Sequence, residues 1–299
     1  MWFLFALLTA LCWGTADLFY KKGSEESDPM SHIQITIMVG LVMGVHAIGL
    51  MIFTGASFQP YDMLKYLPVS AMYIISMMIG YFGLRYIELS IASPIQNTSG
   101  ALTSVLCFIF FAQALSGMTI TGMVIVTIGV VALAVIESKE ERRVRLPLYP
   151  EKYKKGVLVL IFPLLYCVFD ALGTFLDAVY LDELELIGET EALLAYEFTF
   201  LFVSILLLIY MTCIKKQHFY IHKQGNRTLA ALMETAGQFF YVYAMSGKAV
   251  VAAPLIATYS IFSVILLRIF CKEKLTAIKY VMIGIVLVGI AVLGLAEAA

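Results

Sequence analysis

The chain has 299 residues, of which 61% are hydrophobic and only 14% are charged, and its formal net charge is −1. Soluble domains carry about a quarter charged residues, so this composition excludes an ordinary soluble domain. The apolar residues form runs of about 20, which is the length that a helix needs to cross a bilayer core. The sequence therefore predicts an all-α membrane protein, because the strands of a membrane barrel would alternate in polarity over about ten residues.

The apolar runs predict ten transmembrane helices, joined mostly by short connections. In chain order they cover residues 2–20, 33–54, 65–86, 90–111, 118–137, 156–180, 191–213, 228–247, 250–270 and 277–296. The first span lacks a cationic start and a small-residue cleavage site, so we interpret it as a retained helix and not as a signal peptide. The five cysteines fall in or beside the spans, as expected of small apolar packing residues.

Lysine and arginine are unevenly divided between the two sides that the ten spans define. The side that holds the N-terminus carries Lys65 and Lys248, and the other 18 of the 20 Lys and Arg residues lie on the opposite side. Cytoplasmic loops of membrane proteins carry the excess of Lys and Arg. We therefore expect a multi-pass protein of the cytoplasmic membrane, with both termini extracellular and the loops 138–155 and 214–227 inside the cell.

The second half of the chain repeats the first without a gap, in a register that aligns Met1 with Ile161 and Lys139 with Ala299. In this repeat register Asp17 meets Asp177, and "IASPIQNT" meets "VAAPLIAT". Each half holds five predicted spans, an odd number, so the halves must cross the membrane in opposite directions. The prediction is therefore two inverted five-helix repeats, residues 1–139 and 161–299, which are typical of secondary transporters. Residues 140–160 form a basic cytoplasmic linker and the start of span six.

Several short motifs resemble those of one known transporter family. Trp-Gly stands late in the first span ("CWGTADLFYKK"), Ala-x-Pro opens spans four and nine, and "CKEKLT" precedes a Gly-rich last span. These motifs and the duplicated ten-span layout together make the chain resemble the EamA-type members of the drug/metabolite transporter superfamily over essentially its full length. The resemblance implies transport of a small metabolite. Two positions depart from the family pattern: Gln113 replaces the usual acid after span four, and Gly173-Thr174 replaces a second Trp-Gly.

Three aspartates in the predicted spans are candidates for substrate binding or coupling. Ionisable groups are costly to place inside a membrane, so each one is by default a candidate for a functional role. Asp170 follows Lys155 by 15 residues, about 22 Å along a helix, which places it near the bilayer centre. Asp17 and its repeat partner Asp177 would each lie near one mouth of a cavity. The alternative for Asp17 is a simple pair with Lys21 one turn away. For Asp170 it is a structural hydrogen bond to a neighbouring span.

Polar and aromatic residues of the same spans complete the predicted site. Glu234, Gln238 and Tyr241 recur at helical spacing and therefore share one face of span eight, which indicates an aqueous cavity. Acids beside aromatic rings suit a cationic ligand. The candidate residues for substrate binding and coupling are Trp13, Asp17, Gln96, Asn97, Tyr166, Asp170, Asp177, Glu234, Gln238, Tyr241 and Tyr259.

Other functional classes find little support in the sequence. No Gly-rich phosphate loop, nucleophile–base pair or nucleic-acid motif is visible, so we expect no enzyme, cofactor, metal or nucleic-acid partner. His218 and His222 have metal-ligand spacing, but they lie in a basic loop that suits lipid headgroups better. Glu197 fits an interfacial and a functional place equally well. His46, alone in its span, is interpreted as a packing residue.

The sequence therefore predicts a secondary transporter that moves a small polar, amine-bearing metabolite by alternating access, with proton coupling as an option. Its expected partners are this substrate and membrane lipid, and no oligomeric state is indicated. One alternative is a neutral or zwitterionic metabolite, such as an amino acid or a nucleoside, with the acids used only for proton coupling. The alternative of another class is a membrane sensor or scaffold that transports nothing, against which an acid near the midplane argues.

Overall fold

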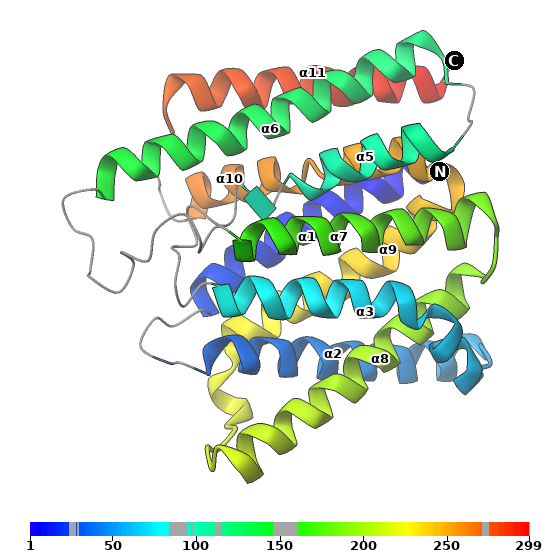
Figure 1. Cartoon of the computed structure of the whole chain (residues 1–299), viewed down its shortest axis with the longest axis vertical. Helices are drawn as coiled ribbons and strands as arrows, with labels where there is room; N and C mark the ends of the chain where they lie inside the picture. Colours follow the sequence, from blue (N-terminus) through cyan, green and yellow to red (C-terminus); the bar gives the residue numbers. More distant parts are fainter. Residues whose placement is uncertain are drawn as a thin grey trace.

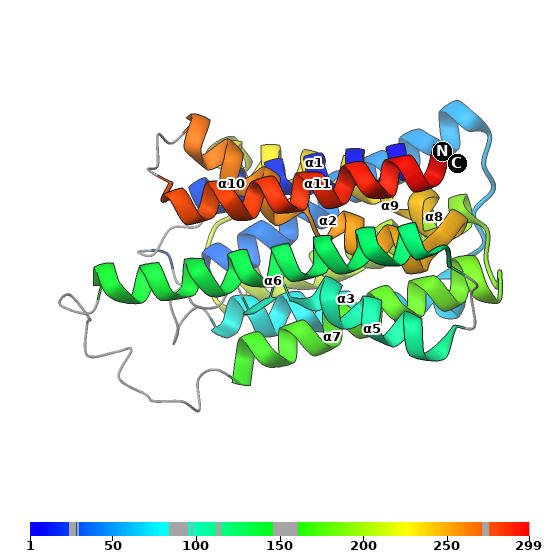
Figure 2. The ribbon, with the colours of Figure 1, turned by 90° about the horizontal axis from the view of Figure 1, so that it is seen from above.

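The apolar runs fold into long helices that lie roughly side by side in the computed structural model (Figures 1 and 2). The structure describes residues 1–23, 28, 30–83, 95–96, 98–111, 115–145, 161–270 and 275–298. Within these ranges there is no β-strand, so the all-α class is confirmed.

The helices follow one another with few interruptions. In chain order they are α1 (Trp2–Gly23), α2 (Ser31–Thr54), α3 (Pro60–Gly83), α5 (Ser99–Phe110), α6 (Gly117–Arg145), α7 (Ile161–Ala178), α8 (Glu189–Ile209), α9 (Gly225–Ile256), α10 (Tyr259–Phe270) and α11 (Ala277–Ala298). Short π-helical turns, η4 (Val179–Glu183) and η5 (Tyr210–Ile214), extend α7 and α8, and a 3-10 turn, η6 (Ile221–Lys223), precedes α9.

Seven stretches of the described residues are long and apolar enough to cross a membrane. They are Trp2–Tyr20, Ser31–Thr54, Pro60–Gly80, Ile161–Glu183, Glu189–Ile214, Lys248–Phe270 and Ala277–Ala298. Two shorter apolar helices, Ser99–Phe110 and Gly117–Leu133, add to them. The chain is thus a multi-pass membrane protein by length and composition of its helices. The predicted span 228–247 forms part of α9 but is not among the seven, and it is the span whose inward face carries Glu234 and Gln238.

The predicted span nine is broken in the structure. Its helix starts at a kink, where Lys248 has non-helical backbone angles (φ −160°, ψ 68°), and α9 then ends at Ile256 while α10 begins at Tyr259. In the turn between them the Thr258 hydroxyl donates to the Leu255 carbonyl at 2.7 Å. The Thr258 amide donates to the same carbonyl at 3.1 Å, so the turn pairs its own polar groups, as a helix break at membrane depth requires.

The same turn recurs at the corresponding place in the first half of the chain. Thr98, which aligns with Thr258 in the repeat register, precedes α5, and its hydroxyl donates to the Ile95 carbonyl at 2.6 Å. The helices that follow also correspond, since α5 and α10 begin and end at residues that align with each other. The same hydrogen bond from a threonine hydroxyl to a backbone carbonyl therefore precedes the corresponding helices in both halves of the chain.

The main helix contacts also come in matched pairs. In the repeat register, α1 corresponds to α7, α2 to α8, α3 to the first part of α9, α5 to α10 and α6 to α11. α1 packs on α9 as α7 packs on α3, α1 packs on α10 as α7 packs on α5, and α2 packs on α9 as α8 packs on α3. The contacts α2–α8 and α6–α11 each map onto themselves. Exchanging the two halves thus reproduces all these contacts.

The bundle has two distinct ends. Both termini lie at one of them, which we call the terminal end, and α1 starts there, whereas α7 starts at the opposite end (Figure 1). That opposite end, the basic end, holds the end of α6 and the turn from η5 to η6 with Lys215, Lys216 and Lys223. α6 and α11 lie side by side along one edge of the bundle (Figures 1 and 2).

The Trp-Gly motif of the first span has a packing reason. A Cβ atom at Gly14 would lie 2.7 Å from the carbonyl oxygen of Tyr259 and 2.9 Å from the amide nitrogen of Ser263. Both atoms belong to the backbone of α10, so neither can rotate away. Glycine at this position therefore lets α1 lie against the start of α10, where the predicted site residue Tyr259 stands.

We predict that Gly14→Ala lowers the stability of the protein in detergent by about 1–3 kcal/mol, the usual cost of overpacking a filled site. The midpoint of thermal unfolding measures this effect. Gly49→Ala is the matched control, because Gly49 lies inside α2 and a Cβ there would meet nothing within 4 Å. The control should leave the midpoint unchanged or raised, since alanine stabilises helices relative to glycine. Equal losses in the two variants would contradict the close approach of α1 and α10.

Candidate functional site

Three acids from three helices lie near one another inside the bundle. Glu234 of α9 is close enough to Asp17 of α1 and Asp170 of α7 for their charges to interact. Tyr259, at the start of α10, is close enough to interact electrostatically with all three carboxyls. The three side chains are half-buried. Carboxylates gathered in a medium of low dielectric favour a bound cation. We call Asp17, Asp170 and Glu234 the acidic group.

Each half of the chain supplies a serine to an acid of the other half. Ser99, the first residue of α5, donates its hydroxyl to Oδ2 of Asp170 at 2.6 Å. Ser263 of α10 lies within hydrogen-bonding reach of Asp17. The helices that restart after the two breaks therefore hold the acids of α1 and α7. The alternative pair of Asp17 with Lys21 falls on a side chain outside the described residues.

Aromatic rings and two buried donors adjoin the acidic group. Trp13 packs against Tyr241 and Tyr259, with ring centroids 5.2 Å and 6.2 Å apart. Nε1 of Trp13 and Nε2 of Gln238 are both buried, and neither has a hydrogen-bond partner within the described part of the chain. Leaving a buried donor unpaired costs about 1–3 kcal/mol. These donors are thus the places where an acceptor atom of a ligand, or a water, would be stabilised most.

Gln96 and Tyr166 meet over the face of α3. A Cβ atom at Gly80 would lie 2.5 Å from Cδ2 of Tyr166 and 2.8 Å from Nε2 of Gln96. The structure therefore places both predicted residues against the same glycine. Asn97, the remaining candidate of the broken span four, lies outside the described residues.

Asp177 belongs to a separate cluster, two helical turns along α7 from Asp170 toward the terminal end. Its side chain is 0% exposed, and its carboxylate accepts hydrogen bonds from the hydroxyls of Tyr66, Tyr73 at 2.9 Å and Tyr241 at 2.8 Å. The hydroxyls of Tyr73 and Tyr241 are also 2.8 Å apart. Three donors satisfy this buried carboxylate. The cluster ties α3, α7 and α9 together, and we call it the tyrosine cluster.

Sequence reasoning missed two members of the tyrosine cluster. Tyr66 and Tyr73 are seven residues apart on α3, so they share one helix face. That spacing was the available signal, but aromatic residues at helical spacing are common in any apolar helix. Only the fold shows that this face meets Asp177.

Sequence reasoning also missed a hydrogen-bonded pair between α2 and α8. Nδ1 of His46 lies 2.8 Å and 2.9 Å from the two carboxylate oxygens of Glu197. The Glu197 side chain is 0% exposed, whereas that of His46 is 34% exposed. The interpretation of His46 as a lone packing residue is therefore wrong. No local pattern could reveal this pair, because its members lie in opposite halves of the chain.

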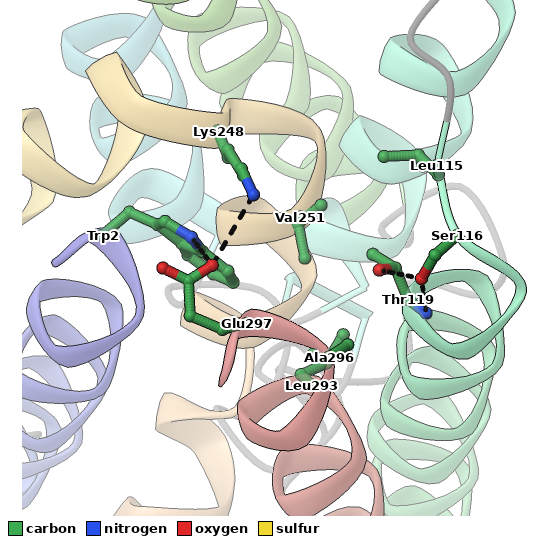
Figure 3. Close-up of a pocket in the computed structure, with 9 residues that line it drawn as sticks. All are labelled: Trp2, Leu115, Ser116, Thr119, Lys248, Val251, Leu293, Ala296 and Glu297. Carbon is green, nitrogen blue, oxygen red and sulfur yellow. Dashed lines mark hydrogen bonds and ion pairs between the residues drawn. The ribbon is translucent and has the colours of Figure 1, made fainter. Parts of the chain in front are cut away.

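A pocket of about 290 Å³ at the terminal end involves other residues (Figure 3). Nε1 of Trp2 donates to Oε2 of Glu297 at 2.6 Å, and Nζ of Lys248 lies 3.6 Å from the same oxygen. The N-terminal ammonium group lies 3.8 Å from Oε1 of Glu297. These contacts fix the end of α11 to α1 and to the kink of α9. No predicted site residue lines this pocket, so we regard it as structural.

Within the described part of the chain, no group of three or more His, Cys, Asp or Glu side chains is arranged to hold a metal ion. Asp17, Asp170 and Glu234 are therefore not placed as three ligands of one metal ion.

Comparison with known proteins identifies the family. The sequence profile of the EamA-like transporter family matches twice, over residues 1–135 and 157–295. The resemblance inferred from the motifs is thereby confirmed. Solved structures also match. One, a crystal structure of a protein that is described no further, has a TM-score of 0.73 at 11% identity and covers 100% of this chain and 99% of that chain. This likeness concerns the fold alone. No curated protein matches.

We predict that His46→Phe destabilises the protein by about 3–5 kcal/mol, because it leaves the Glu197 carboxylate buried without its partner. The double variant His46→Phe/Glu197→Leu removes both polar groups and should recover most of this loss. Chemical unfolding of the wild type, both single variants and the double variant measures the coupling. Additive losses in the double variant would show that the two side chains do not depend on each other.

Proposed function

The chain belongs to the EamA-like transporter family, and from that premise we propose that it is a secondary active transporter. Its proposed substrate is a small polar, amine-bearing metabolite, which crosses the cytoplasmic membrane by alternating access. The observation that carries this proposal is the acidic group, in which Asp17, Asp170 and Glu234 converge from three helices.

The surroundings of the acidic group support a cationic substrate. The interaction partners of its three carboxyls within the described residues are hydroxyls and other acids, with no Lys or Arg side chain among them. The aromatic rings of Trp13 and Tyr259 lie beside the acids and could face an ammonium group. An ammonium ion would relieve the repulsion between the carboxylates, whereas an anionic substrate would increase it.

A second candidate substrate is a zwitterionic or neutral metabolite, with the acids used for proton coupling. The buried donors of Trp13 and Gln238 favour it, because a carboxylate or carbonyl oxygen would satisfy them. The two candidates agree on where the substrate lies. They differ in whether the acidic group contacts an amine or only carries protons.

Alternating access is supported by the relation between the two halves. α1 and α7, which correspond in the repeat register, start at opposite ends of the bundle (Figure 1). The main helix contacts come in pairs: for each contact, the corresponding helices of the two halves make a second one. We infer two inverted repeats of five spans each, in which the acidic group lies at the repeat interface, where secondary transporters bind their substrates. In this conformation the tyrosine cluster would close the substrate pathway between the acidic group and the terminal end.

We predict that Asp170→Asn folds normally but loses transport. A thermal-shift screen of purified protein against organic amines, amino acids and nucleosides supplies the test compound, and uptake and counterflow in proteoliposomes measure transport. Removing one charge from a buried contact costs about 2–5 kcal/mol, so we expect a loss of at least about 30-fold. Glu183→Gln is the control, because Glu183 is exposed at the end of η4, which continues α7.

Wild-type counterflow by Asp170→Asn would exclude an essential charge at this position. A wild-type protein that no compound stabilises and that shows no counterflow would instead favour the sensor or scaffold. If amines bind but transport is independent of pH, the acids bind substrate and do not couple protons.

We also propose that the terminal end is extracellular, because the excess of Lys and Arg lies at the basic end. Two exposed positions test this in a variant without native cysteines: Glu183→Cys at the terminal end and Lys216→Cys at the basic end. A membrane-impermeant thiol reagent should label the first in intact cells and the second only after lysis. The reverse pattern would invert the proposed orientation.

A further inference from the structure

A long apolar groove lies on the side of the bundle, between α2 and α9. Its volume is about 710 Å³. The lining residues are Met38, Leu41, Val42, Val45, His46, Ile221, Thr228, Leu232, Thr235, Ala236, Phe239 and Phe240. From Thr228 to Phe240 the groove follows α9 for about 18 Å, given a rise of 1.5 Å per residue. It thus runs from the basic end of the bundle to the middle of α9.

Three polar side chains in the wall of this groove, those of Thr228, Thr235 and His46, already have hydrogen-bond partners within the protein. The hydroxyls of Thr228 and Thr235 both donate to carbonyls of their own helix, those of Gln224 and Ala231, at 2.8 Å. Nδ1 of His46 is bonded to Glu197. The groove therefore presents mainly hydrocarbon, which suits an acyl chain better than a polar solute.

The mouth of the groove at the basic end is strongly cationic. Ile221 lines the groove, and the turn around it carries the exposed side chains of Lys215, Lys216, His218, His222 and Lys223. The sequence from residue 198 to residue 233 contains no Asp or Glu, and Asp28, an acid from another segment at this end, lies 3.8 Å from Nη2 of Arg227. Lys223 lies over the ring of Tyr220, with Nζ 5.1 Å from the ring centroid, and this contact orders its side chain at the basic end.

We propose that the groove and this basic turn together bind one anionic phospholipid from the leaflet at the basic end. One acyl chain lies in the groove between α2 and α9, and the phosphate of the headgroup is held by Lys216 and Lys223. Clusters of Lys and Arg beside a membrane helix select anionic lipids in this way. The lipid would support the outer face of α9, whose inner face carries Glu234 and Gln238. The proposal does not depend on the transport function.

Native mass spectrometry of the purified protein tests the proposal with two lipids that have the same palmitoyl and oleoyl chains. We expect palmitoyl-oleoyl phosphatidylglycerol to bind about tenfold or more tightly than palmitoyl-oleoyl phosphatidylcholine, since each basic residue near the phosphate adds to the attraction. Inorganic phosphate should not displace the lipid, because it lacks the acyl chain. Displacement by phosphate would show a simple anion site and overturn the lipid assignment.

Two pairs of variants separate the groove from the basic turn. Leu232→Trp fills the groove and should weaken binding of phosphatidylglycerol about tenfold. Leu229→Trp is its control, because Leu229 is similarly exposed on α9 (43% against 45%) but does not line the groove. Lys216→Ala/Lys223→Ala should abolish the preference for phosphatidylglycerol over phosphatidylcholine, whereas Lys139→Ala, which removes an exposed lysine of α6 at the same end, should not.

The outcomes distinguish a specific site from ordinary bilayer contact. Equal binding of the two lipids by the wild type, or equal loss in Leu232→Trp and Leu229→Trp, would overturn the proposal. If Leu232→Trp does not fold, Ala236→Leu fills the same groove with less volume and is judged by the same comparison with Leu229→Trp.

Discussion

A carboxylate that lies inside a membrane must find a partner on another helix, and this constraint organises the whole bundle. Asp170 accepts from Ser99 of α5, and Glu197 pairs with His46 of α2. Asp177 accepts from three tyrosines of α3 and α9. Each partner is far away in the sequence, so each contact selects one neighbour among helices that are all apolar. Apolar packing alone would leave that choice weakly determined, because lipid tails are as apolar as the side chains they would replace.

The sequence predicted the all-α class, most of the long apolar helices and the helix faces on which several acids and aromatic residues lie, because these features depend on local patterns. Long apolar runs are unambiguous, and the repeat register predicted that α5 and α10 would correspond. The helical spacing of Glu234, Gln238 and Tyr241 placed them on one face. Two features could not be predicted. In the turns before α5 and α10, the hydroxyl and the amide of one threonine both donate to the carbonyl three residues earlier, and proline alone does not specify where a helix restarts.

Partners across helices were the other feature that the sequence could not supply. The spacing of residues along the sequence shows which of them share a helix face. Which other helix packs against that face is determined only by the packing of the whole bundle. Tyr66 and Tyr73 were therefore indistinguishable from ordinary core aromatics, and His46 from a packing residue. The matched contacts of the two halves narrow this problem. Once one cross-helix contact is known, the repeat predicts a second between the corresponding helices, as α1–α10 and α5–α7 illustrate.

The degree to which each acid is satisfied separates structural from functional candidates. Asp177 has three hydroxyl donors, and both oxygens of Glu197 lie within hydrogen-bonding distance of one imidazole nitrogen, so neither needs a ligand. A carboxylate has about four acceptor sites, and the acidic group holds three carboxyls that repel one another. Beside it, the donors of Trp13 and Gln238 are buried without acceptors in the described part of the chain. Among the residues that the structure describes, each carboxyl of the acidic group has a single hydroxyl partner, and the unpaired donors of Trp13 and Gln238 lie one helical turn from Asp17 and Glu234 on α1 and α9. The proposed ligand, with a cationic group and an acceptor group, would pair with both the acids and the donors. We therefore place the proposed binding site in this region and not at the better-bonded tyrosine cluster.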